Sequence, residues 1–350
     1  MLKLYHKNKN NARKKGDLKM FNKYLLTGAT GFLGNTIAWT LHQKGLKCVA
    51  LVLNGDPFIS KLPPSAKVIY GDVQNLKSLY DFFNERDDNT CLIHCAGLVS
   101  IATKKNPNIY KVNVIGTINI LSLALEKGIK KTIYVSSIHA IPTAPKNNVM
   151  TEINNFDEDL VKGEYAKSKA IATKIAVEYS KIGLNISIVH PSGIIGPGDW
   201  RCGEITNIIL SYLKGKLSLG SKGKSNFVDV RDVAEGIIAC AENGENGECY
   251  LLTGHLSPIQ KILEQVRKII NGKKIIYLPL WFIKMIAPLY EKIKIKKKQK
   301  AYLTPYSAYA LGSNSNYSYD KAKKKLNYSS RPLEDTIKDT VQWLKEFKLQ

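Results

Sequence analysis

The chain has 350 residues, of which 44% are hydrophobic, and its 52 Lys and Arg against 29 Asp and Glu give a formal net charge of +23. This length suits one large α/β domain with a covering region, and the apolar content allows a sizeable core. The chain lacks an apolar run of about 18 residues, so we expect no membrane-spanning helix. No nucleic-acid recognition motif accompanies the charge, so we attribute it to a lysine-rich composition and expect no nucleic-acid partner.

The first 20 residues are basic and polar and contain no apolar segment typical of a secretory signal. We expect a disordered extension here, or a start of translation at Met20. Beyond it, short apolar runs alternate with helical patterns. The patterns predict strands at 22–27, 47–53, 67–72, 91–97, 131–137 and 185–191, and helices at 37–45, 76–83, 113–128 and 165–181. Parallel strands that are buried on both faces form unbroken apolar runs like these. The predicted fold class is therefore α/β, a doubly wound parallel sheet.

The first predicted strand ends in a glycine-rich turn, TGATGFLG, at residues 27–34. Gly28 permits a tight turn, Gly31 lets the backbone approach a pyrophosphate, and Gly34 lets the helix pack closely on the strand. The turn follows a strand and opens a helix, which is the context that dinucleotide binding requires. We therefore predict a Rossmann fold, and we include the intervening Thr30, Phe32 and Leu33 in the cofactor site.

The end of the second predicted strand bears on the choice between NAD and NADP. An acidic residue that binds the ribose of NAD is expected there. Leu53 and Asn54 occupy the place, Asp56 comes two residues late, and no arginine is present to hold a 2′-phosphate. We expect Asn54 to contact the ribose or phosphate, and we favour NADP slightly because no acidic residue would repel its phosphate.

Three regions follow from these patterns. We expect the NAD(P)-binding Rossmann domain at 21–195, with 225–250 returning to it. A smaller C-terminal region that covers the substrate would comprise 196–224 and 251–350. Within it, the stretch 281–300 joins an aromatic and aliphatic segment to a run of lysines. Contact of this stretch with a membrane surface is one interpretation, but we favour a helix over the pocket followed by solvated charges.

Tyr165 and Lys169 stand four residues apart at the start of a predicted helix, so their side chains share one face. A free tyrosine has a pKa near 10, which is too high for a base at neutral pH. The charge of a neighbouring lysine, together with that of an oxidised nicotinamide, would favour the tyrosinate. The pair alone is a weak signal, and the glycine turn in the same chain strengthens it.

Several motifs together resemble the extended short-chain dehydrogenase/reductase superfamily. The likeness extends over residues 22–347, and within the NAD(P)-dependent epimerase/dehydratases the chain is most similar to the dihydroflavonol-4-reductase and 3β-hydroxysteroid dehydrogenase group. The motifs are TGATGFLG (27–34), GD (71–72), HCAG (94–97), NVIGT (113–117), YVSS (134–137), YAKSK (165–169), HPSGIIGPGD (190–199) and FVDVRDVAEGI (227–237).

The resemblance implies roles for individual residues. Ser137, Tyr165 and Lys169 match the catalytic serine, tyrosine and lysine, with Ser137 as a hydrogen-bond donor to the oxyanion. The implied cofactor contacts are Asp72 and Val73 at the adenine, Ala96 and Gly97 over the ribose and pyrophosphate, Asn113 in the helix, Pro191 beside the nicotinamide, and Tyr165 and Lys169 themselves. No metal site is implied.

The implied function is an NAD(P)-dependent oxidoreductase that transfers a hydride between nicotinamide and a secondary alcohol or ketone. A nucleotide-sugar epimerase or dehydratase on the same scaffold is the alternative. A non-catalytic sensor is a third possibility, against which the intact Ser137, Tyr165 and Lys169 argue. The expected partners are a small-molecule substrate and a second copy of the chain, bound through the helices at 113–128 and 165–181 as in relatives.

The six cysteines include no C-x-x-C pair, and no histidine stands at metal-ligand spacing beside them. Most fall inside apolar stretches and read as reduced, buried thiols. We therefore expect a cytoplasmic protein. Asp229 and Asp232 are expected to cap or pair, and Arg231 either to pair with them or to steer an acidic group of the substrate.

Overall fold

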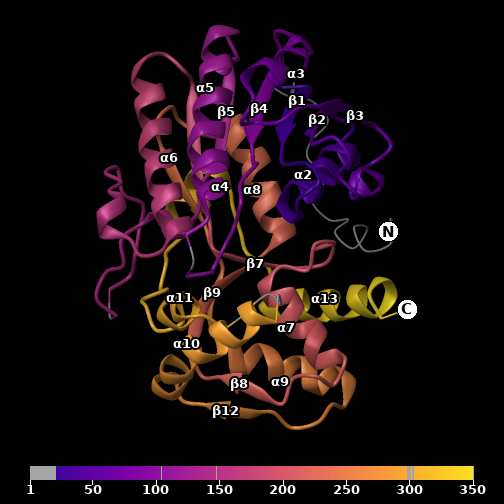
Figure 1. Ribbon diagram of the computed structural model, residues 1–350. Coiled ribbons are helices and arrows are strands. Elements are labelled where there is room, and N and C mark those ends of the chain that lie inside the picture. Colours follow the sequence, from indigo (N-terminus) through magenta and orange to yellow (C-terminus); the bar gives the residue numbers. More distant parts are fainter. Residues whose placement is uncertain (1–20, 104, 147, 298–300, 302, 350) are drawn as a thin grey trace.

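The computed structural model describes residues 21–103, 105–146, 148–297, 301 and 303–349. The expectations for residues 1–20, including the alternative start at Met20, lie outside this range. A seven-stranded parallel sheet with the order β10-β6-β5-β4-β1-β2-β3 forms the centre of the fold (Figure 1). Its strands are β1 (Lys23–Thr27), β2 (Lys47–Val52), β3 (Ala66–Tyr70), β4 (Thr90–His94), β5 (Lys131–Val135), β6 (Ile186–Pro191) and β10 (Cys249–Leu252). The predicted fold class is confirmed.

Helices cover both faces of this sheet, as a doubly wound fold requires. One face packs against α2 (Phe32–Gln43), α8 (Val230–Asn243) and α12 (Asp320–Leu326), whose apolar residues share a core with the strands. The other face packs against α3 (Tyr80–Asn84), α5 (Gly116–Glu126) and α6 (Glu164–Lys181). Strand β1 pairs in parallel with β2 on one side and with β4 on the other, and the strand order reverses between β1 and β4. Ligands of such sheets bind at the carboxyl ends of the strands beside this reversal.

Short helical turns connect these elements. They are the 3₁₀ turns η1 (Ile59–Lys61), η2 (Leu76–Leu79), η4 (Ile138–Ala140) and η5 (Glu158–Leu160), the short helix α4 (Pro107–Tyr110) and the π-helical turn η3 (Lys111–Ile115). By length and composition alone, the continuous helical stretch 107–126 would suffice to cross a membrane. Half of its most apolar window is buried, and α5 packs on the central sheet in the second core. Its apolar character is therefore explained by packing inside this domain.

The second region lies below the carboxyl edge of the sheet in Figure 1. It contains a three-stranded sheet of order β11-β9-β7 and a two-stranded sheet of β12 and β8. Its strands are β7 (Gly193–Ile195), β8 (Leu219–Ser221), β9 (Lys224–Asp229), β11 (His255–Pro258) and β12 (Ile276–Leu278). Its helices are α7 (Glu204–Leu213), α9 (Ile259–Ile270), α10 (Leu280–Lys296), α11 (Pro305–Ala310) and α13 (Leu333–Phe347).

The segment expected to return to the Rossmann domain is divided between the two regions. Strand β9 pairs with β7 and β11, so residues 224–229 belong to the three-stranded sheet. The residues that return to the central sheet are those of α8 and β10, because β10 pairs with β6. A second return was not foreseen: Ala322 and Leu326 of α12 are buried in the same core as α8. The domain boundaries themselves stay a prediction.

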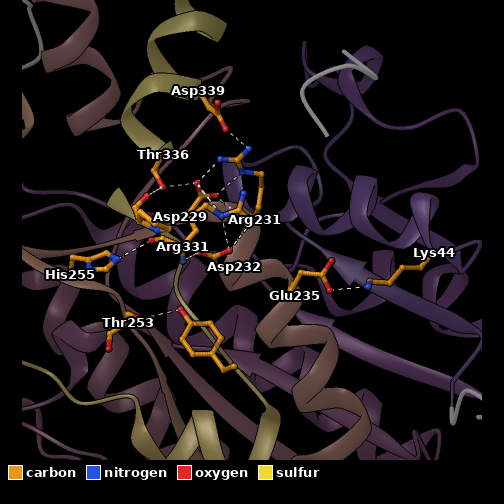
Figure 2. A network of polar contacts seen from close by, with 12 residues as sticks. Lys44, Asp229, Arg231, Asp232, Glu235, Thr253, His255, Arg331, Thr336 and Asp339 are labelled. Atoms are coloured by element: carbon orange, nitrogen blue, oxygen red, sulfur yellow. Dashed lines mark hydrogen bonds and ion pairs between the residues drawn. The ribbon is translucent and has the colours of Figure 1, made fainter. Parts of the chain in front are cut away.

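A buried network of ion pairs joins the end of β9 to α8 and α13 (Figure 2). Arg231 donates from Nε and Nη2 to Asp229 at 2.9 and 2.7 Å and from Nη1 to Asp339 at 2.8 Å. Arg331 pairs with Asp232 at 2.7 Å. The expected pairing of Arg231 with Asp229 is confirmed, but Asp232 pairs with Arg331 and the second partner of Arg231 is Asp339. These groups hold the C-terminal helix against the end of β9.

Candidate active site

The glycine turn between β1 and α2 leaves no room for larger side chains. Gly28 has φ of +71°, and a Cβ there would lie 2.7 Å from the backbone nitrogen of Ala96. A Cβ on Gly34 would lie 2.1 Å from the carbonyl oxygen of Gly28. Gly31 is the N-cap of α2, and no side chain caps this end of the helix. The unpaired N–H groups of the first turn therefore suit a pyrophosphate.

The other residues predicted within this turn have different surroundings. Phe32 and Leu33 begin α2, and their side chains pack against the core. Phe32 and Leu33 can therefore contact a cofactor at the helix N-terminus only through their backbone groups. The Thr30 hydroxyl donates to Asp56 Oδ2 at 2.7 Å.

Asp56 is a site residue that the sequence reasoning set aside. Its side chain is 6% exposed and pairs with Arg201 at 2.6 Å. Burial alone would raise the Asp56 pKa, but hydrogen bonds from Thr30 and the Phe58 backbone and the charge of Arg201 hold the pKa below its usual value. The turn after β2 thus brings an ionised carboxylate back to the glycine turn. Asn54, the expected contact, is exposed in this turn.

No arginine was found in the sequence at the end of the second strand, but in the fold Arg201 lies beside this turn. It comes from the loop after β7, 145 residues from Asp56 in the chain. Its guanidinium stacks over the Phe58 ring at 4.6 Å and lies 3.4 Å from the Thr30 hydroxyl. In the sequence, Arg201 is marked only by its place directly after GPGDW (196–200). Nothing in that motif indicates a contact with residue 56.

The loop after β4 is held by a chain of hydrogen bonds. Thr27 Oγ1 accepts from the backbone nitrogen of Ala96 at 3.1 Å and pairs with His94 Nδ1 at 2.7 Å. His94 Nε2 pairs with Thr117 Oγ1 at 3.0 Å, and Thr117 donates to the carbonyl of Asn113. This direction of donors makes His94 neutral with its proton on Nε2, in keeping with burial, which lowers its pKa to about 3. These hydrogen bonds together fix the backbone of Ala96 and Gly97 over the glycine turn.

Asn113 lies in the π-helical turn η3 and joins this loop to α6. It accepts from the Leu98 backbone at 2.7 Å and donates to Ser168 Oγ at 2.9 Å. A Cβ on Gly97 would lie 3.4 Å from Asn113 Oδ1 and 3.6 Å from Lys169 Nζ. Asn113, Gly97 and Lys169 therefore meet at one place. π-Helical turns occur frequently at functional sites.

Asp72 and Val73 lie after β3, on the far side of the glycine turn from Tyr165. The Asp72 carboxylate accepts from the backbone of Gln74 at 2.9 Å. Val73 is buried against Gly116, where a Cβ would lie 2.7 Å from the valine side chain. Neither residue joins the cluster around Tyr165, which agrees with an expected role at the adenine end.

Ser137 and Tyr165 meet at the carboxyl edge of the sheet. Ser137 follows β5, and Tyr165 is the second residue of α6. Burial raises the Tyr165 pKa to about 12, while the hydrogen bond with Ser137 acts in the opposite direction. The charge of Glu204, in the first turn of α7, raises it further. Lys169 was expected to lower the Tyr165 pKa. In the protein without cofactor the Tyr165 pKa is raised instead, because the effect of burial is the largest.

Lys169 is buried one turn along α6 and points toward β5. Its ammonium group donates to the carbonyl oxygen of Val135 at 2.8 Å and lies 5.1 Å from the Tyr134 ring centre. Burial lowers its pKa to about 8. A lysine that titrates near neutral pH can hold or lose its charge in response to a ligand.

Pro191 is the last residue of β6. The preceding residue, His190, contacts the loop that carries Ser137. His190 Nδ1 donates to the carbonyl oxygen of Ser137 at 3.0 Å, and its ring stacks on Phe156. Among the described residues, His190 Nε2 and Ser192 Oγ are buried polar atoms with no hydrogen-bond partner. Buried polar atoms are normally paired, so both atoms could accept a partner at this edge of the sheet.

A pocket lies between the two regions, lined by His139 and Ala166, which adjoin Tyr165, and not by Tyr165 itself. His139 packs edge-on against the Tyr165 ring and pairs with the hydroxyl of Tyr306 at 3.2 Å. Gly163 has φ of +95°, and a Cβ there would lie 2.5 Å from the Tyr306 ring. The pocket lining is mixed: aliphatic and tyrosine side chains (Ile138, Ile141, Val161, Ala166, Tyr306, Tyr309 and Tyr317) stand beside polar ones (Thr143, Lys162, Ser225, Ser313, Asn314 and Ser315). Within the described ranges, no group of three or more His, Cys, Asp or Glu residues is arranged to hold a metal ion.

The fold and site define a dinucleotide-binding α/β protein with Ser, Tyr and Lys at the carboxyl edge of its sheet. The NAD dependent epimerase/dehydratase family model matches residues 24–252. The chain therefore belongs to this family of NAD-dependent enzymes, and the resemblance seen in the motifs is confirmed.

Individual relatives agree with this assignment. The chain is 28% identical over 337 residues to a putative dihydroflavonol 4-reductase of a Synechocystis strain, which covers 93% of this chain and 95% of the relative. The crystal structure of gox2253 has a TM-score of 0.80 at 28% identity and covers 93% of this chain and 99% of that one. A dTDP-glucose 4,6-dehydratase from Bacillus anthracis, solved in complex with NAD, has a TM-score of 0.74 at 20% identity and covers 93% and 97%.

Proposed function

We propose that the protein is an NAD-dependent oxidoreductase that interconverts a ketone and a secondary alcohol. The observation that carries the proposal is the proximity of Ser137 and Tyr165, close enough for Ser137 to oppose the rise in the Tyr165 pKa, with Lys169 buried one helical turn away. All three lie at the carboxyl edge of the sheet, beside the glycine turn. When bound, the cofactor supplies or accepts a hydride and, when oxidised, brings a positive ring that lowers the pKa of a nearby phenol.

Tyr165 is the proton donor in the direction of ketone reduction. A pKa of about 12 keeps its hydroxyl protonated at neutral pH. The phenol gives its proton to the substrate oxygen, and the Ser137 hydroxyl donates a hydrogen bond to the same oxygen. Lys169 offers a positive charge close to Gly97 and Asn113, where a ribose fits. In alcohol oxidation the same groups act in reverse.

The cofactor we propose is NAD, which reverses the slight preference for NADP drawn from the sequence. The ionised Asp56 at the glycine turn suits a ribose 2′-hydroxyl and repels a 2′-phosphate. Arg201 could favour a phosphate, but its charge is already paired with Asp56. The NAD bound in the solved dehydratase of similar fold supports the same choice.

The pocket offers few groups for the diphosphate of a nucleotide sugar. A sugar nucleotide carries a diphosphate, which proteins bind with cations or helix N-termini. Among the described lining residues the cation is Lys162, and it lies over the Tyr309 ring at 4.7 Å. The remaining lining combines tyrosines and aliphatic side chains with uncharged hydroxyl and amide groups, which suit the oxygen atoms of a ketone or alcohol. The nucleotide-sugar alternative, which the dehydratase of similar fold keeps open, is therefore second.

The test is turnover with NADH and a panel of ketones, beside a panel of sugar nucleotides. Tyr165→Phe should lower turnover of the best substrate at least about a hundredfold, because the proton donor is lost, while NAD binding is retained. Tyr179→Phe is the matched control, since it removes a hydroxyl from the same helix that bonds Ser122 away from the site. Unchanged turnover in Tyr165→Phe would refute the mechanism, and turnover of sugar nucleotides alone would favour the alternative.

A homodimer through the helices at 113–128 and 165–181, and a cytoplasmic location, stay proposals. Both helices lie on one face of the central sheet and pack against each other in Figure 1. Sedimentation velocity checks the first.

A further inference from the structure

Helix α10 exposes a line of large apolar side chains. Trp281, Met285 and Leu289 recur every fourth residue and are 68%, 61% and 64% exposed. Residues at this spacing lie on one face of a helix. Exposure of a single apolar side chain needs no explanation, but a contiguous line of them on one helix usually marks a contact surface.

The opposite face of α10 packs against the rest of the protein. Ile283 and Ala287 are buried against Ala308 of α11. Glu291 is 6% exposed and accepts a hydrogen bond from the Thr103 backbone at 2.9 Å. These contacts fix the helix on the protein without help from Trp281, Met285 or Leu289. The expectation that the segment covers the pocket as a packed helix explains only its inner face.

The same helix continues into positive charge. Lys292 and Lys296 follow on the exposed face, and Lys297 ends the helix. In the part of the chain that the structure describes, none of these three lysines forms an ion pair. The side chains of Ile293 and Ile295 are exposed between them. An apolar half followed by a basic half matches the chemistry of an anionic lipid surface, where acyl chains adjoin charged headgroups.

We propose that α10 docks the protein on an anionic membrane surface. Trp281, Met285 and Leu289 enter the boundary between headgroups and acyl chains, and Lys292, Lys296 and Lys297 contact the lipid phosphates. The helix lies along the surface and does not cross it. Because α10 packs on α11, and α11 carries Tyr306 into the pocket, the docked surface would lie one helix away from the substrate site.

The tryptophans of this chain give a direct test in the intact protein. The chain has four, and Trp39, Trp200 and Trp343 are all buried. A change in fluorescence on adding vesicles therefore reports on Trp281. With vesicles of equal parts phosphatidylglycerol and phosphatidylcholine we expect a blue shift and co-sedimentation of the protein. Phosphatidylcholine vesicles should bind much less, and high salt should weaken the binding.

Variants separate the two halves of the surface. Met285→Ser with Leu289→Ser keeps Trp281 as the probe and should lower partitioning at least about tenfold. Lys292→Gln and Lys296→Gln should each lower it about fivefold, because a basic residue near such a surface contributes on the order of 1 kcal/mol. Ile182→Ser is the control, as Ile182 is 64% exposed beyond the end of α6. NAD binding checks that every variant is folded.

Three results would overturn the proposal. One is the absence of a blue shift and of co-sedimentation with the anionic vesicles. Another is equal binding to neutral vesicles that the lysine variants leave unchanged. The third is self-association that Met285→Ser with Leu289→Ser abolishes, without vesicle binding, which would show that a second copy of the chain covers this face.

Discussion

Arg231 holds a buried carboxylate whose charge would otherwise be poorly compensated (Figure 2). Asp229 has a fully buried side chain and accepts hydrogen bonds from the Arg231 guanidinium, the Arg231 backbone and the Thr336 hydroxyl. In Arg231→Ala the nearest remaining cation is Arg331, at 3.7 Å. Loss of one partner from a buried pair costs about 3–5 kcal/mol. We therefore expect the free energy of unfolding to fall by that amount at neutral pH.

The free energy of unfolding should also depend on pH in a defined direction. Hydrogen bonds and the charges of Arg231 and Arg331 outweigh burial and hold the Asp229 pKa below its usual value. The carboxylate thus stabilises the wild type above its unfolded pKa of about 4, and this stability is lost as pH falls through the folded pKa. Without Arg231 the buried charge is a penalty that protonation relieves. The difference between wild type and variant should therefore shrink in acid.

Urea unfolding at neutral and acid pH measures both effects. Glu235→Gln is the control, because it removes the exposed pair with Lys44 (2.9 Å) that Figure 2 also shows. Exposed pairs contribute about 1 kcal/mol or less. A loss below about 1 kcal/mol in Arg231→Ala, or a difference that does not change with pH, would refute the reasoning.

Two predictions concern the cofactor. Asp56→Ser should weaken NAD binding about tenfold, the effect of losing a hydrogen bond to a charged group, and improve the relative affinity for NADP; an unchanged ratio in calorimetric titration would contradict the proposed ribose contact. NAD binding should also weaken as pH rises through about 8, because burial lowers the Lys169 pKa to that value and the neutral amine no longer attracts the dinucleotide. Lys169→Met should remove this pH dependence, and its persistence in the variant would assign it to another group.

The central sheet was predictable because its signals are local. Six of its seven strands were predicted from apolar runs, which parallel strands buried on both faces need. The edge strand β3 is only partly buried, and its apolar run is correspondingly interrupted by Lys67. The seventh, β10, has four residues and was seen only as part of a returning segment. Strands of the covering region, such as β7 and β12, have three residues each, too few to show a period.

The cofactor site was predictable where a motif fixes geometry and not where distant segments meet. Glycines 28, 31 and 34 were found because the turn itself requires them. The Asp56 and Arg201 pair was missed because its two members come together only through tertiary packing. The outer face of α10 could not be assigned from the sequence for a related reason: an apolar helical pattern does not reveal which side of the helix packs on the protein.

The return of α12 to the central domain has a consequence for synthesis of the chain. Ala322, Leu326 and Tyr328 complete the core beneath α8, and the Tyr328 hydroxyl donates to the carbonyl of Thr253. Residues that follow the cofactor domain in the chain are thus needed to bury its apolar surface. Until they are made, the nascent domain keeps this surface uncovered, and contacts so distant in sequence form slowly. Chaperone dependence during translation is the expected cost of this topology.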